Sequence, residues 1–113
     1  MELPNARGAT VDSAKVRDYL LSPSHPIGRF KAAVFVALGY SANDWEVLRD
    51  DLLTLARTGS AVAGPPNLHG TKFEVDGILV TPSGRAARFR TVWMVRAGEQ
   101  RPRFVTAYPK NAR

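Results

Sequence analysis

Two histidines, His25 and His69, are the side chains best suited to acid–base chemistry near neutral pH. Histidine ordinarily titrates in this range, so each is a candidate general acid or base. Each also has a structural interpretation, His25 as the cap of the helix that follows and His69 as an exposed loop residue. There is no cysteine and no H-E-x-x-H pattern, which excludes thiol catalysis and argues against a zinc hydrolase. We therefore expect no metal and no cofactor.

The remaining side chains complete the requirements of metal-free RNA cleavage. In that reaction a ribose 2′-OH attacks the adjacent phosphate, which needs a base, an acid and cations that stabilise the phosphorane. Lysine and arginine supply cations, hydroxyls can hydrogen-bond the phosphate, and aromatic rings can stack on unpaired bases. The alternative is that the threonines are ordinary strand residues and the rings pack in the core. The candidates are Lys31, Lys72, Arg88, Arg90, Thr91, Trp93, Phe104, Thr106 and Tyr108.

Positive charge is concentrated in the last third of the chain. Residues 1–76 hold 8 basic and 9 acidic residues, whereas residues 77–113 hold seven Arg and one Lys against Glu99 alone, which gives the total of +6. Arginine can grip a phosphate with two parallel hydrogen bonds. A solvated surface that keeps the protein in solution is the alternative. We favour a nucleic-acid partner, because positive charge that serves only solubility does not need to be concentrated in one segment of the chain.

The length of 113 residues and the hydrophobic fraction of 44% fit one compact domain, residues 1–113. The longest apolar run is the seven residues Ala32–Leu38, far short of the ~20 needed to span a membrane, so no membrane contact is expected. The polar, proline-broken start MELPNARG predicts no secretory signal. We expect the site of action to be the cytoplasm.

Hydrophobic periodicity predicts an α+β fold, with about three N-terminal helices packed on one face of a three- to four-stranded antiparallel meander sheet. The helical half covers about residues 12–58. Asp12 is the expected cap of the first helix, and residues 27–38 form the second, with Phe30, Val34 and Leu38 on one face. The third helix starts near Ser41 and Asp44, which resemble a capping box, and turns Trp45, Leu48, Leu52 and Leu55 inward.

The sheet half covers about residues 70–109. Strands are predicted over 71–81, 86–95 and 103–109, with a bend or bulge at Asp76-Gly77. Alternation on the second strand puts Arg88 and Arg90 on one face and Thr91 and Trp93 on the other. On the third strand Phe104, Thr106 and Tyr108 are expected to project together, and Thr106 and Tyr108 can then meet Thr91 and Trp93 as cross-strand neighbours.

Several segments resemble a family of small bacterial domains of unknown function, and the resemblance spans nearly the whole chain. They are LPNA, LLSPSHPIGRFKAAVF, DWEVLRDDLLTLA, GTKFEV, SGR, TVWMVRAGE and PRFVTAYP. Members of that family are similar to the C-terminal toxin domains of bacterial polymorphic and contact-dependent systems. Those toxin domains are grouped with the barnase, EndoU, colicin and RelE-like ribonucleases, whose common architecture is called the BECR fold.

The resemblance implies a four-stranded sheet whose open face carries the site, and metal-independent RNA cleavage through the 2′-OH. Residues 60–64 or 7–11 are the candidates for the fourth strand. The HPxGxxK motif matches His25, Gly28 and Lys31, and the TVW and TAYP motifs match Thr91, Trp93, Thr106 and Tyr108. His69-Gly70 stands where the family pattern has Tyr-Gly, so His69 is either incidental or a second histidine of an EndoU-like site.

The leading hypothesis is therefore a toxin-like endoribonuclease. Its catalytic residues are predicted to be His25, Lys31, Arg90, Thr106 and Tyr108, and its RNA-binding residues Arg88, Thr91, Trp93, His69 and Lys72. His25 serves as general acid or base, and Lys31 or an arginine stabilises the phosphorane. The alternative is a non-catalytic basic module that binds nucleic acid or an acidic protein, such as an immunity or antitoxin-type partner.

Overall fold

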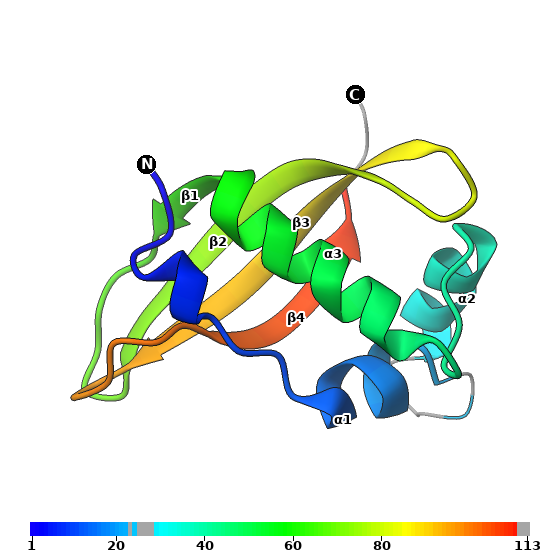
Figure 1. Ribbon diagram of the computed structural model, residues 1–113. Helices are drawn as coiled ribbons and strands as arrows, with labels where there is room; N and C mark the ends of the chain where they lie inside the picture. The colour runs from blue at the N-terminus through cyan, green and yellow to red at the C-terminus, as the bar shows by residue number, and fades with distance from the viewer. Residues whose placement is uncertain (23, 25–28, 111–113) are drawn as a thin grey trace.

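Four antiparallel strands form a single sheet in the order β1-β2-β3-β4 (Figure 1). They are β1 (Ser60–Ala63), β2 (Gly70–Val80), β3 (Ala86–Arg96) and β4 (Arg103–Pro109). The computed structural model describes residues 1–22, 24 and 29–110. The predicted meander is confirmed, and residues 60–63 supply its fourth strand. The other candidate segment makes only one parallel bridge, from Thr10 to Arg103, beyond β4.

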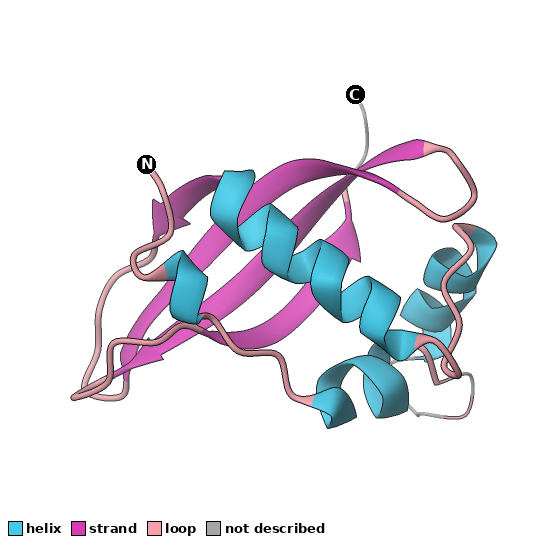
Figure 2. Ribbon diagram, in the orientation of Figure 1, coloured by secondary structure: helices cyan, strands magenta, loops and turns pink. Residues whose placement is uncertain are grey.

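The helices all precede the sheet in sequence, which confirms the α+β fold. They are η1 (Ala6–Gly8), α1 (Ser13–Lys15), the π-helical turn η2 (Val16–Leu20), α2 (Arg29–Ala37) and α3 (Trp45–Thr58). The longest, α3, crosses one face of the sheet, as Figure 2 shows. In the described part of the chain no helix is long and apolar enough to cross a membrane.

Local sequence signals set the helix ends. The Asp12 carboxylate accepts a hydrogen bond from the Ala14 backbone N–H at 2.9 Å, as expected of an N-cap. The Ser41 hydroxyl accepts one from the Asp44 N–H at 3.3 Å before α3. Gly39 follows α2 with a φ of +98°, a left-handed conformation that glycine adopts at low cost. The predicted cap at Asp12 is confirmed, and the bond from the Asp44 N–H to Ser41 is one of the two hydrogen bonds that a capping box makes.

The core lies between α3 and the sheet. Leu48, Leu52 and Leu55 of α3 are buried, as are Phe73, Val75 and Leu79 of β2 and Phe89 and Trp93 of β3. The pairing of β2 with β3 is continuous from Gly70 to Val80, so the expected bulge at Asp76-Gly77 is wrong. Gly77 instead makes room for α3, because a Cβ at that position would lie 3.1 Å from the Leu55 Cγ.

The buried face of α2 matches the predicted one only in part: Leu38 packs against the core, and the side chain of Phe30 lies outside the described ones. Ala32 and Phe35 are buried, and Phe35 stacks on Phe89 of β3 with ring centroids 5.4 Å apart. Val34, expected to face inward, is 38% exposed. Phe35, one position after Val34, is the residue that faces inward at this turn of the helix. Asp51 of α3 accepts a 2.6 Å hydrogen bond from the hydroxyl of the buried Tyr40.

A β-bulge in β4 corrects the predicted side-chain faces. The register shifts between Val92 and Trp93, so Val92 pairs with Thr106 while Trp93 pairs with Phe104, and Val105 is the extra residue. An extra residue interrupts the alternation of side chains along a strand. Phe104 therefore packs into the core, while Thr106 and Tyr108 lie on the face that carries Arg90 and Val92. Their predicted meeting with Thr91 and Trp93 is wrong.

Candidate functional site

Lys31 is at the centre of a cluster on the sheet face turned away from α3, which we call the open face. Its Nζ donates hydrogen bonds to Thr106 Oγ1 at 2.8 Å and to the Tyr19 hydroxyl at 3.3 Å. The same ammonium lies 5.4 Å from the ring centroid of Tyr19 and 5.6 Å from that of Tyr108. Residues from η2, α2 and β4 thus converge on one cation. We call Tyr19, Lys31, Thr106 and Tyr108 the lysine cluster.

The positive charge of Lys31 is not neutralised by a described residue. No carboxylate in the described part of the chain lies within ion-pair distance of its Nζ. Its hydrogen-bond partners are neutral hydroxyls, and its ring contacts are with the electron-rich faces of tyrosines. The side chain is half-buried, where Coulomb interactions are stronger than in bulk water. An anion at the lysine cluster would therefore meet an available cation.

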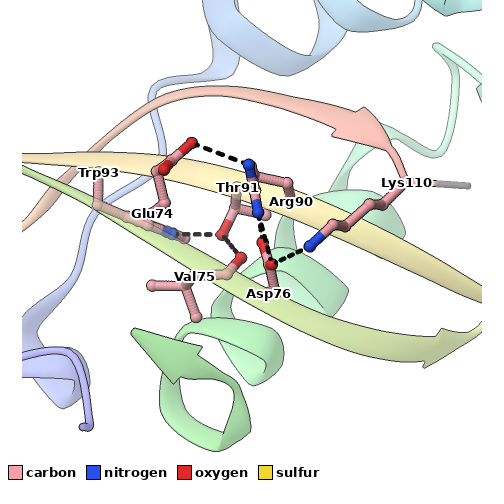
Figure 3. Close-up of polar contacts among 7 residues, drawn as sticks. All are labelled: Glu74, Val75, Asp76, Arg90, Thr91, Trp93 and Lys110. Atoms are coloured by element: carbon pink, nitrogen blue, oxygen red, sulfur yellow. Dashed lines mark hydrogen bonds and ion pairs between the residues drawn. The ribbon is translucent and has the colours of Figure 1, made fainter. Parts of the chain in front are cut away.

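Arg90, next to this cluster, is by contrast already paired. Its Nε and Nη2 donate to the two carboxylate oxygens of Asp76 at 2.8 and 2.9 Å, and its Nη1 lies 3.4 Å from Glu74 Oε2. Lys110 Nζ donates to Asp76 Oδ2 at 2.7 Å. Figure 3 shows these four side chains on strands β2 and β3 and just beyond β4. Arg90 also pairs directly across the strands with Tyr108.

These contacts shift the protonation equilibria of the groups involved. The hydrogen bond from Arg90, together with that from Lys110, lowers the pKa of Asp76 to about 2, against the partial burial that opposes the shift. Hydrogen bonding to Asp76 raises the pKa of Arg90 further above its usual value, and a hydrogen bond with Tyr108 adds to this effect. Arg90 is thus held in place beside Tyr108 with its charge matched by Asp76.

The low pKa of Asp76 predicts an acid-sensitive contribution to stability. The unfolded carboxylate, with its usual pKa of 3.8, takes up a proton before the folded one does. The stabilisation is therefore complete above about pH 4 and is lost as the pH falls toward about 2. We expect the free energy of unfolding of an Asp76→Asn variant to fall less steeply over this range, as measured by urea denaturation. Asp50→Asn, at a 64% exposed side chain of α3, is the matched control and should keep the wild-type steepness.

Two predicted RNA-binding residues, Thr91 and Trp93, are buried in the core, and so is Phe104, a candidate for base stacking. Thr91 and Trp93 have no exposed surface, and Phe104 is 4% exposed, so none can reach a base. The Trp93 Nε1–H donates to Thr91 Oγ1 at 2.7 Å, and that hydroxyl donates to the Val75 carbonyl at 2.9 Å, as Figure 3 shows. Trp93 packs edge-on against Phe104 with ring centroids 5.3 Å apart. All three stabilise the sheet.

His69 and Lys72 lie away from the lysine cluster. His69 is exposed, and its carbonyl accepts a hydrogen bond from Ala97 N–H just past the end of β3. Thr106 pairs with Val92, and four residues of strand from there to Arg96 span about 13 Å. His69 therefore lies near the Arg96 end of β3, away from the lysine cluster that it would have to join in the EndoU-like alternative. Lys72 is exposed opposite Met94, nearer to His69 than to Arg90.

Arg88 is the last predicted site residue within the described part of the chain. Arg88 is exposed on the open face two positions from Arg90, and no ion pair with a described residue involves it. His25 lies outside the described residues, as does Gly28.

Tyr19 was not among the predicted site residues, because its spacing with Val16 and Leu20 is typical of the apolar face of a helix. The tyrosine ring and hydroxyl are compatible with either role, so the sequence carried no separate signal for it.

The described residues contain no group of three His, Cys, Asp or Glu side chains that could hold a metal ion. The lysine cluster brings together an ammonium that has no ion pair with a described residue, three hydroxyls and two tyrosine rings. Such groups can bind an oxyanion and stabilise negative charge that develops on it.

Comparison with known proteins places the chain in a family. One chain of a solved structure described as "Contact-dependent growth inhibition toxin - immunity protein complex from Klebsiella pneumoniae 342" is similar in fold. Its TM-score is 0.69 at 23% sequence identity, over 90% of this chain and 100% of that chain. A search of curated proteins gave no significant match. Residues 2–111 match the family described as "Domain of unknown function (DUF6883)". Because this match extends over nearly the whole sequence, the chain belongs to the DUF6883 family.

Proposed function

We propose that this domain is a toxin-like, metal-independent endoribonuclease. The observation that carries the proposal is the Lys31 ammonium, which has no ion pair with a described residue, contacts two tyrosine rings and lies 2.8 Å from the Thr106 hydroxyl on the open face. An ammonium in this position can stabilise the phosphorane formed during 2′-OH attack. The likeness to one chain of a toxin–immunity complex supports a role in a toxin–immunity system, and an RNA target would place the action in the cytoplasm.

In the proposed reaction the ribose 2′-oxygen forms a bond to phosphorus while the bond from phosphorus to the 5′-oxygen breaks. A base removes the 2′-OH proton and an acid protonates the departing 5′-oxygen, so the products are a 2′,3′-cyclic phosphate and a 5′-hydroxyl. We assign His25 as the acid or base. Thr106 and Tyr108 would hydrogen-bond the phosphate, and Lys31 would carry the charge stabilisation.

Arg90 was predicted as a catalytic residue, and in this proposal it has a different role. Its guanidinium fork is engaged by Asp76 and Glu74, so we assign it as a positioning residue for Tyr108. Arg88, which has no ion pair with a described residue, is the better candidate for a phosphate contact on the same strand. Lys72 would contact RNA farther along the open face, and exposed His69 would act at most as a peripheral contact.

Incubation of the purified protein with RNA in the presence of EDTA tests the proposal. We expect cleavage that EDTA does not suppress, with 2′,3′-cyclic phosphate ends, and a loss of about 100- to 10,000-fold in the His25→Ala variant. The control is Arg57→Gln, which removes a cation from the exposed end of α3 and should leave cleavage unchanged. Intact RNA, or full cleavage by His25→Ala, contradicts the assigned mechanism.

A binding module is the second candidate, and one surface favours it. Ile78 and Val80 are 60% and 74% exposed at the end of β2. They lie close to Arg88 and Lys110, which line shallow pockets with Ile78. Exposed apolar side chains beside positive charge are suited to an acidic protein partner. This candidate predicts salt-dependent binding of such a partner or of RNA, with the RNA recovered intact from the same assay.

A further inference from the structure

A groove of about 480 Å³ lies next to the lysine cluster, between the N-terminal segment and the start of β4. Val105 and Met94 contribute to its lining, and Val105 directly precedes Thr106 in the bulge. Met94 lies two positions beyond Val92, the strand partner of Thr106. The groove therefore begins beside the lysine cluster and continues along β3 toward Arg96.

The charges that line this groove are predominantly positive. Lys15 of α1 and Arg96 at the end of β3 are exposed, and neither has an ion pair with a described residue. Arg103 also lines the groove and is paired with Glu99 at 2.9 Å. The single acidic residue, Asp12, is already used as the cap of α1. Two unpaired cations thus flank a partly apolar floor.

Single-stranded nucleic acid is the ligand class that this arrangement suits. Phosphates pair with lysine and arginine, and base or ribose surfaces can rest on apolar side chains such as Met94. The length of β3 from Val92 to Arg96 is about 13 Å, so the groove extends well beyond a single phosphate at Lys31. A strand bound there would leave one of its phosphodiesters at the lysine cluster.

We propose that this groove binds the single-stranded RNA backbone adjacent to the cleavage point, with Lys15 and Arg96 on its phosphates. The inference rests on the proposed ribonuclease function and extends it from the reacting phosphate to the flanking nucleotides. It also explains why the arginine-rich segment includes Arg96, which is too far from Lys31 to act on the same phosphate.

A groove elsewhere on the protein provides a matched control. It also has a volume of about 480 Å³ and also contains two arginines, Arg7 and Arg57, but it is formed by η1 and the segment before it together with the end of α3. The test compares the double variant Lys15→Gln/Arg96→Gln with the double variant Arg7→Gln/Arg57→Gln. Both remove two positive charges, so a difference between them cannot arise from net charge alone.

Binding is measured by fluorescence anisotropy with a short 2′-O-methyl RNA, which has no 2′-OH nucleophile and is not cleaved. We expect Lys15→Gln/Arg96→Gln to bind more weakly and to reduce the slope of log K against log salt by about 1.4, since each phosphate contact on a single strand contributes about 0.7. The control pair should change the slope much less. Equal slopes for the two double variants would overturn the groove assignment.

Cleavage provides the second readout. A dinucleoside monophosphate has a single phosphodiester and no flanking phosphate, so its kcat/KM should not change in Lys15→Gln/Arg96→Gln. The kcat/KM for a long RNA should fall in the same variant. An equal fall on both substrates contradicts the groove and leaves the ribonuclease function in place. If the wild type cleaves neither substrate, the ribonuclease function fails, while the anisotropy slopes still decide whether the groove binds RNA.

Discussion

Replacing Lys31 by methionine is expected to lower kcat for RNA cleavage by about 100- to 1,000-fold, the usual cost of removing one group that stabilises developing negative charge. Methionine keeps most of the length and apolar character of the lysine stem but carries no charge. The contacts with the rings of Tyr19 and Tyr108 can therefore persist in part, so the variant isolates the ammonium. Initial rates on a long RNA at saturating concentration measure the effect.

Two comparisons make this prediction specific. Arg57→Met removes a cation from the exposed last turn of α3 and should retain wild-type kcat. Lys31→Arg keeps the charge, but its larger planar fork does not reproduce the 2.8 Å contact with Thr106 Oγ1, and we expect partial activity between wild type and Lys31→Met. A Lys31→Met variant that is folded and within tenfold of wild type would remove Lys31 from the reaction.

Truncation of Trp93 to alanine is expected to lower the free energy of unfolding by about 3–5 kcal/mol. The indole has no exposed surface and packs against Phe104, so the truncation opens a cavity in the centre of the sheet. A loss of this size is a large part of the 5–15 kcal/mol that stabilises an ordinary domain. Urea denaturation followed by circular dichroism measures it, since Trp45 would complicate a fluorescence signal.

The same experiment can separate packing from hydrogen bonding. Thr91→Val keeps the shape of the side chain but leaves the buried Trp93 Nε1–H without its acceptor, which should cost about 1–3 kcal/mol. Ile78→Ala, at a 60% exposed position on the neighbouring strand, serves as control with an expected change within about 0.5 kcal/mol. If Trp93→Ala cost no more than this control, Trp93 would not be the core residue that its burial indicates.

The predictions for Lys31 and for Trp93 concern two groups of residues that the sequence analysis placed in one site. Thr91 and Trp93 were expected on the site together with Thr106 and Tyr108, since all four belong to the TVW and TAYP motifs. In the structure the first two stabilise the core, and the last two lie on the open face with Lys31. The difference is one residue of register. The bulge at Val105 inserts a residue into β4 and re-aims everything that follows it.

The ion pairs of Arg90 were also not predicted from the sequence. Charge counts placed eight basic residues against one acid in residues 77–113, which suggested an uncompensated basic surface. The compensating acids, Glu74 and Asp76, lie just before that segment, on the adjacent strand. Cross-strand neighbours depend on the antiparallel register of β2 and β3, so the net charge of a segment does not give the net charge of a sheet face.

The sequence by itself determined those features that depend on local interactions. The order of helices and strands, the cap at Asp12 and the inward face of α3 all follow from the spacing of neighbouring residues. Hydrophobic periodicity and capping operate over a few residues, which a linear reading captures. The association of Lys31 with Thr106 and Tyr108 was also expected, from the resemblance of the motifs that contain them.

Only the tertiary structure decided which charges remain available and which side chains reach the surface. It placed Asp76 on Arg90, separated His69 from Lys31, added Tyr19 to the lysine cluster and opened the groove beside it. Each of these depends on contacts between residues distant in the chain, and a shift of one position in a strand reverses the face of every following side chain. The charge and the absence of cysteine limited the possible chemistry, whereas the fold left Lys31 beside Thr106 and Tyr108 without an ion-pair partner among the described residues.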